Sequence, residues 1–189
     1  MNLFYEDYPM SISVYGEEIP IITDFREYVK LMDMLNNSEL CSRDKIYFLQ
    51  QYFKKIPSDF QSAVDALIDF VLMEDLKTSG RQSEYGTNNT PKKEVYSFEI
   101  DYPFIFSAFL SEYGINIRTI PYMHWWEFRL LFDGLSEKTE IKQRIIYRSV
   151  NLNSIKNKEE RERIRRIQDA IRLPDSGVSD YEIGDAFEW

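Results

Sequence analysis

The stretch YMHWWEFRLLFDGL, residues 122–135, places two adjacent tryptophans directly after the chain's only histidine. At about 100° per residue, its apolar side chains divide between two opposite sides of a helix. One side carries Trp125, Phe128, Phe132 and Leu135, and the other carries Met123, Trp126 and Leu130. A helix that is apolar on two sides must be covered on both. The stretch therefore predicts either a central core helix or a helix that binds a partner through one of its sides.

The rest of the chain has a mostly helical pattern, with one β-hairpin near its start. Residues 11–22, SISVYGEEIPII, alternate apolar and polar side chains around Gly16, which is typical of a hairpin. Helical spacing recurs in several segments, among them residues 57–76 and a helix from about residue 102 that ends near Gly114. The predicted fold is mostly α: a multi-helix domain of about seven helices with a short N-terminal β-hairpin.

Two segments lack this periodic apolar spacing. Residues 78–95 combine Ser, Gly, Asn, Thr, Lys and Pro with one aromatic residue, so they are predicted to form a flexible linker or loop. Residues 174–189 contain five acidic and no basic residues and are predicted to form a mobile tail. The two segments delimit an N-terminal region, residues 1–77, with the hairpin and three helices, and a C-terminal helical part, residues 96–173, with the Trp-Trp helix.

Charge is unevenly distributed along the chain, whose formal net charge is −9. Residues 136–173 contain eleven basic and six acidic residues. The basic residues of the last predicted helix alternate with glutamates, which favours intrahelical ion pairs on a solvated face. The alternatives are binding of nucleic acid or of an acidic protein segment, including the chain's own tail. An acidic body with one basic zone is not typical of a dedicated nucleic-acid-binding protein.

The sequence contains no P-loop, dinucleotide-binding or nucleophile-elbow motif. One histidine and one cysteine are too few for the usual zinc sites. Cys41 is expected to be a small core thiol, and His124 a packing residue at a helix start. No apolar run is long enough to span a membrane, and the N-terminus does not resemble a signal peptide. We therefore expect a cytoplasmic, non-enzymatic protein without catalytic, cofactor-binding or metal-binding residues.

Three motifs lie in the C-terminal helical part: YPFIFSAFLSEYGINI at residues 102–117, MHWWEFRLLFDGL at residues 123–135 and IIYR at residues 145–148. Together they resemble motifs of a family of proteins from tailed phages of Gram-positive bacteria. The segment GEEIPIITDFREY, residues 16–28, also resembles the opening hairpin and first helix of that family. The similarity covers roughly residues 10–173, and the family is associated with assembly chaperones of long, non-contractile (siphovirus-type) tails.

The resemblance implies a helical protein of the infected host cytoplasm that binds the tape-measure protein and keeps its hydrophobic helices soluble. It also implies recruitment of the major tail protein and departure before the tail is complete. The two-sided apolar helix further predicts a tendency to form a homo-oligomer. A structural virion protein, such as a connector or tail component, and a nucleic-acid-binding regulator are the alternatives.

Partner-binding residues are inferred from residue type, because tryptophan and arginine are favoured at the centres of protein interfaces. The inferred set lies on the Trp-Trp helix and in the Tyr-Arg pair of the following helix. Its members are Met123, Trp125, Trp126, Arg129, Leu130, Tyr147 and Arg148.

Overall fold

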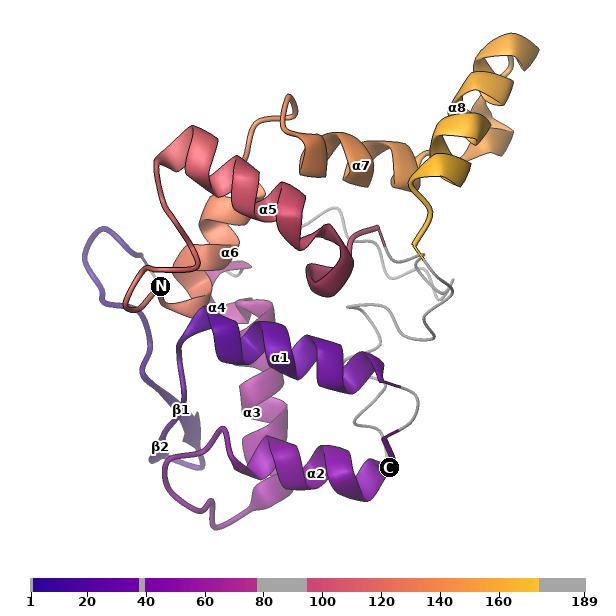
Figure 1. Cartoon of the computed structure of the whole chain (residues 1–189). Coiled ribbons are helices and arrows are strands. Elements are labelled where there is room, and N and C mark those ends of the chain that lie inside the picture. Colours follow the sequence, from indigo (N-terminus) through magenta and orange to yellow (C-terminus); the bar gives the residue numbers. More distant parts are fainter. Residues whose placement is uncertain (1, 38–39, 78–94, 174–189) are drawn as a thin grey trace.

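The computed structural model describes residues 2–37, 40–77 and 95–173 (Figure 1). This part of the chain forms eight α-helices, one short 3-10 helix and a two-stranded antiparallel sheet. The elements are β1 (Ser11–Val14), β2 (Glu17–Pro20), α1 (Phe25–Asn36), α2 (Ser42–Gln50), α3 (Phe60–Leu72), α4 (Glu74–Lys77), α5 (Phe98–Tyr113), α6 (Trp125–Gly134), α7 (Glu140–Ser149), η1 (Leu152–Ser154) and α8 (Lys158–Ala170). The predicted mostly α fold with a short N-terminal hairpin is confirmed. The predicted linker, apart from Val95, and the predicted tail lie outside the described residues.

The hairpin forms where the alternating pattern predicts it. Ile12 on β1 lies opposite Ile19 on β2, and both are buried. Tyr15 and Gly16 connect the strands with positive φ angles of 50° and 82°. Two consecutive residues with positive φ make a tight turn that matches the natural twist of the strands. The buried side of the hairpin packs against α3.

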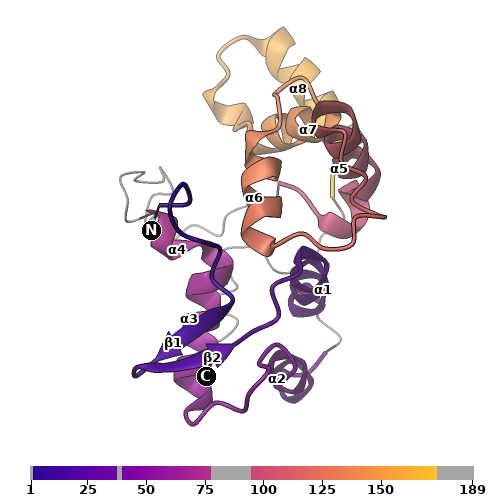
Figure 2. The same ribbon diagram turned by 90° about the vertical axis from the view of Figure 1, so that its left-hand side faces the viewer.

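The helices are arranged around one continuous hydrophobic core. Figure 1 shows the hairpin, α2 and α3 in the lower half of the molecule and α5, α7 and α8 in the upper half. Helix α6 stands between these halves in the side view of Figure 2, and α8 lies at the end furthest from the hairpin. The buried cluster runs from Ile12 of the hairpin to Ile141 of α7. Side chains from both predicted regions of the chain therefore share one core.

Helix α3 ends earlier than its apolar pattern predicts. The sequence predicts one helix over residues 57–76, but α3 spans Phe60–Leu72 and α4 follows as a separate turn. Met73 adopts a left-handed conformation, with φ 58° and ψ 38°, which breaks the helix. Such a conformation is uncommon for a residue other than glycine, so a tertiary contact must stabilise the end of α3.

Helix α5 begins earlier than predicted, at Phe98 rather than near residue 102. The Ser97 side chain accepts a hydrogen bond from the Ile100 N–H, and the Asp101 carboxylate accepts one from the Ser97 N–H. This reciprocal capping satisfies N–H groups at the helix start, and Pro103 lies inside the helix beyond it. The predicted left-handed glycine at the end of α5 is confirmed, because Gly114 has a φ of 68°.

The basic helix α8 packs only against the end of α7 and against η1 among the major contacts of the described chain. Arg163 pairs with Glu160 at 2.8 Å, and Arg165 pairs with Glu162 at 3.4 Å. These pairs confirm the predicted intrahelical ion pairing. Because they neutralise part of the basic charge within the helix itself, α8 does not present a uniformly basic face.

Candidate functional site

His124 connects the start of α6 to the segment that precedes the hairpin through hydrogen bonds from both sides of its ring. Its Nδ1 atom accepts a hydrogen bond from the Trp126 N–H at 3.0 Å, so this nitrogen carries no proton. The opposite nitrogen, Nε2, lies 3.0 Å from the Pro9 carbonyl oxygen and donates to it. The Tyr8 ring stacks on the imidazole with a centroid separation of 4.7 Å. Burial lowers the pKa of His124, which favours the neutral ring, and its predicted packing role at a helix start is confirmed.

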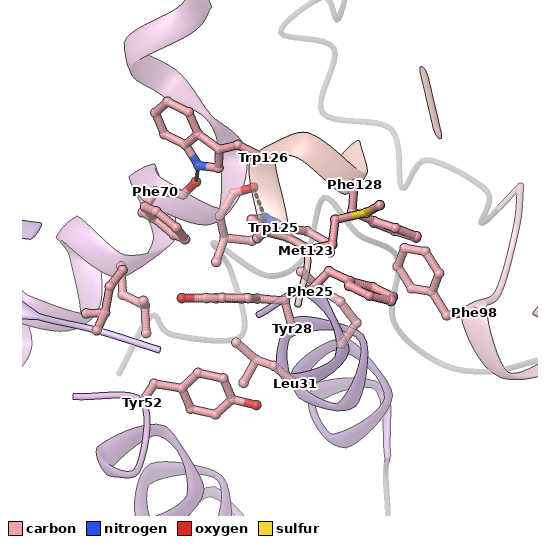
Figure 3. Close-up of a cluster of buried hydrophobic side chains, with 14 of the residues drawn as sticks. Phe25, Tyr28, Leu31, Tyr52, Phe70, Phe98, Met123, Trp125, Trp126 and Phe128 are labelled. Atoms are coloured by element: carbon pink, nitrogen blue, oxygen red, sulfur yellow. Dashed lines mark hydrogen bonds between the residues drawn. The ribbon is translucent and has the colours of Figure 1, made fainter. Parts of the chain in front are cut away.

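The two tryptophans bind the end of α3 through their indole N–H groups (Figure 3). Trp125 donates to the Val71 carbonyl oxygen at 3.1 Å, and Trp126 donates to the Phe70 carbonyl oxygen at 2.8 Å. The last carbonyls of a helix lack donors within the helix itself. The indoles add donors at this helix end, where the Met73 N–H also bonds to the Asp69 and Phe70 carbonyl oxygens.

Aromatic rings extend from this point into the centre of the molecule. The Phe128 ring stacks on Phe25 of α1 at 4.6 Å and on Phe109 of α5 at 5.1 Å between centroids. The Trp125 ring lies 5.3 Å from Tyr28 of α1 (Figure 3). Helix α6 thus contacts α1 and α5 with one side and α3 with the other. Of the two interpretations of its apolar pattern, the structure supports the central core helix.

The seven residues inferred to bind a partner do not form one exposed surface. Met123, Trp125 and Trp126 are at most 1% exposed, and Arg148 is buried as well. These four side chains cannot reach a partner in this conformation. Leu130 is 38% exposed, and Arg129 and Tyr147 are half-buried. For these three residues, partner binding stays a prediction.

Arg148 instead forms a buried ion pair that positions α5. Its guanidinium donates to both carboxylate oxygens of Asp101, at 2.6 and 3.0 Å. It also donates to the backbone carbonyls of Val95, at 3.1 Å, and Ile171, at 2.8 Å. A buried charge requires such complete pairing. The network joins the first turn of α5 to α7 and to the chain that follows α8.

Helix α5 is apolar around its circumference, but the described residues cover only one half of it. The covered half carries the buried residues Phe98, Ile105, Ala108 and Phe109. Beside them, the Arg144 guanidinium lies 3.8 Å from the Phe104 ring centroid. The other half, which we call the outer face of α5, comprises Glu99, Ile100, Tyr102, Pro103, Phe106, Ser107, Leu110 and Ser111.

The outer face of α5 is an apolar surface with a single charged side chain, Glu99. Tyr102 is 40% exposed and Leu110 is 45% exposed, while the half-buried Phe106 ring stacks on Tyr102 at 6.1 Å between centroids. A solvated helix face normally carries several charged residues, and contiguous exposed apolar side chains mark binding surfaces. Such a face can bind another apolar surface.

The outer face of α5 is not among the predicted binding residues, although the sequence contains a signal for it. No charged residue occurs between Asp101 and Glu112, a gap of nearly three helical turns. The prediction that Cys41 is a core thiol is wrong, because Cys41 is exposed and its Sγ atom lies 3.1 Å from an Asp44 carboxylate oxygen. None of the helices within the described residues is long and apolar enough to cross a membrane.

Comparison with known proteins identifies a family. A family model described as Bacteriophage Gp15 protein matches residues 4–173, which include every helix and strand described above. Neither the comparison with curated proteins nor the comparison with solved structures found a match. Because the family model spans far more than half of the sequence, this protein belongs to the Bacteriophage Gp15 protein family.

Proposed function

We propose that this bacteriophage protein is a tail assembly chaperone. In the host cytoplasm it binds hydrophobic helices of the tape-measure protein, keeps them soluble and helps to recruit the major tail protein. It acts by binding alone, without enzymatic chemistry. The proposal joins the family membership to the resemblance of the 102–117 and 123–135 motifs to tail chaperones.

The observation that carries the proposal is the uncovered outer face of α5. A helix that presents an apolar ridge to solvent is suited to pack against another amphipathic helix. Tyr102, Phe106 and Leu110 are spaced four residues apart and therefore form such a ridge. The acidic net charge of −9 would keep a complex with a hydrophobic client in solution.

The same features favour this role over the alternatives. The ion pairs of α8 leave its basic residues partly neutralised, so a nucleic-acid-binding regulator has less support. A structural virion protein would use the outer face of α5 permanently rather than release its partner. Protein analysis of purified virions separates the two roles, because the chaperone is absent from them and a connector is present.

The test is co-expression with the tape-measure protein encoded by the same phage. We expect the intact chain to move that protein into the soluble fraction and to co-purify with it. Leu110→Gln should reduce the recovered complex, because it places a polar amide in the middle of the apolar ridge. Soluble recovery of the tape-measure protein with and without the chaperone provides the readout.

Leu130→Gln is the matched control, because Leu130 is similarly exposed but lies on α6. We expect it to leave the complex intact. If Leu130→Gln weakens the complex and Leu110→Gln does not, the binding surface belongs to α6, as the sequence alone predicts. If the tape-measure protein stays insoluble with the unmodified chain, the proposed chaperone function is wrong.

The expected homo-oligomer is tested separately. Light scattering of the purified protein across a concentration series should show a mass that rises above that of a monomer.

A further inference from the structure

A partner can exclude water from the outer face of α5 without leaving the hydroxyl groups of its two serines unpaired. The Ser107 hydroxyl donates to the Phe104 carbonyl oxygen at 3.1 Å, and the Ser111 hydroxyl donates to the Ala108 carbonyl oxygen at 3.2 Å. Burying a polar group is costly only when it lacks a partner. These serines are also small, so a second helix can approach closely beside the ridge of Tyr102, Phe106 and Leu110.

One end of this face carries an acidic corner. Helix α1 packs against α5, and the negative charge of Glu99 on α5 acts on the carboxyl group of Asp33 on α1. Burial, followed by this repulsion, raises the pKa of Asp33 to about 6. Within the described residues, neither carboxylate has a basic partner. By contrast, Glu112 at the other end of α5 accepts a hydrogen bond from the Ser136 N–H at 2.9 Å.

A backbone acceptor adds to this corner. Pro103 has no N–H, so the Glu99 carbonyl oxygen cannot accept the helical hydrogen bond that residue 103 would normally donate. The corner therefore offers two carboxylates and an under-used carbonyl, all of them acceptors. A lysine or arginine side chain of a bound partner would supply donors and positive charge together.

We propose that the outer face of α5 recognises a helix with an aliphatic seam and a lysine or arginine beside that seam, which binds Asp33 and Glu99. This inference deepens the proposed function and rests on it, since the tape-measure protein would supply the helix. The apolar ridge provides most of the affinity, and the acidic corner sets the position of the helix along the ridge. Charge pairs at the edge of an interface contribute more to orientation than to affinity.

The direct test uses synthetic peptides rather than the natural client. Two fluorescently labelled helical peptides share one leucine seam and have blocked ends. One carries lysine beside the seam in its first and last turns, and the other carries glutamate at the same positions. Fluorescence anisotropy with the full chain should show binding of the lysine peptide about three- to fivefold tighter, the scale of one partly exposed ion pair. The preference should shrink in about 0.5 M salt.

Three variants decide whether the corner and the ridge are responsible. Glu99→Lys should reverse the peptide preference, and Asp33→Asn should reduce it. Leu110→Gln should weaken the binding of both peptides equally. Glu137→Lys makes the same charge change at an exposed site outside the outer face and should leave the preference unchanged. Circular dichroism confirms that each variant is folded.

The outcomes separate this inference from the proposed function. If Glu99→Lys retains the preference for the lysine peptide, the acidic corner does not determine which charge the partner must carry, and the inference is wrong. If Leu110→Gln leaves peptide affinity unchanged, the peptides bind elsewhere and the inference is also wrong. If the peptides behave as expected while the tape-measure protein stays insoluble in co-expression, the recognition rule stands and the chaperone function fails.

Discussion

Helices α5 and α6 are both apolar on more than one side, yet within the described residues the tryptophans of α6 are buried and half of α5 stays exposed. The difference lies in the polar atoms that their aromatic side chains carry. Each tryptophan of α6 finds a backbone carbonyl at the end of α3, so its indole N–H is satisfied inside the core. Among the residues that the structure describes, the ridge of α5 makes no such bond to another element. A buried tryptophan helix holds this fold together, whereas an apolar ridge without internal partners is available for binding.

The largest effect expected from this comparison concerns Trp126. Trp126→Ala should cost about 3–5 kcal/mol of unfolding free energy, because it leaves a cavity and removes the donor to α3. Tyr102→Ala on the outer face of α5 should cost less than about 0.5 kcal/mol. Urea titrations followed by circular dichroism measure both values. Trp126→Phe keeps a ring but loses the N–H, so its cost should be intermediate, about 1–2 kcal/mol.

Either of two results would break the contrast between these helices. A large loss of stability for Tyr102→Ala would mean that the outer face of α5 contributes to the fold. A loss below about 1 kcal/mol for Trp126→Ala would mean that the core repacks around the missing ring, which is unusual for so large a side chain.

A smaller effect is expected at the ion pair that holds the covered half of α5. Arg148→Lys retains the charge but cannot form the two-pronged contact with Asp101 or reach both backbone carbonyls. We expect a loss of about 2 kcal/mol, measured in the same urea titration. Arg163→Lys alters an exposed pair on α8 and should change stability by less than about 0.5 kcal/mol. Equal losses for the two variants would show that burial does not strengthen the Arg148 network.

The smallest effect concerns the pH dependence of the α6 start. Burial lowers the pKa of His124, so below pH of about 6.5 the unfolded chain binds this proton more readily than the folded chain. The histidine contribution to stability is therefore complete above that pH and is lost as the pH falls through the lowered pKa. His124→Asn keeps a capping side chain but cannot titrate. Unfolding free energies measured from pH 8 to pH 5 should fall for the native chain relative to the variant.

The contribution of Asp33 to the pH dependence of stability has the opposite sign and must be separated from that of His124. Its pKa of about 6 lies above the ordinary value, so the folded chain binds this proton more readily and gains stability as the pH falls through 6. Both proteins contain Asp33, so the difference between them cancels its contribution. A difference that does not change with pH would contradict the assignment of a neutral, capping histidine.

Local chemistry allowed much of the fold to be predicted from the sequence. The hairpin follows from the alternation around Gly16, and the end of α5 follows from Gly114, because both glycines occupy left-handed conformations. The helical segments follow from apolar spacing. The end of α3 could not be predicted in this way, since it depends on Trp125 and Trp126, which are more than fifty residues further along the chain.

The candidate site was harder to predict than the fold. Residue type alone favours Trp126 and Arg148 as binding residues, but both satisfy their polar atoms inside this chain. The pattern of α5 shows that the helix is apolar all round without showing which half is covered. That choice is made by the position of α7 and by the pair of Asp101 with Arg148, neither of which a helical wheel contains.

The indole hydrogen bonds also have a consequence for synthesis on the ribosome. The end of α3 and the tryptophans that cap it are separated by 54 and 56 residues. A nascent chain that contains only the hairpin and the first helices therefore lacks the indole donors at the end of α3 and exposes the aromatic side chains that α6 will cover. Contacts of such long sequence separation form late and slow the folding of a domain. The N-terminal half must wait for α6 to emerge before it completes its core, so a phage gene truncated after residue 77 should yield an aggregation-prone product.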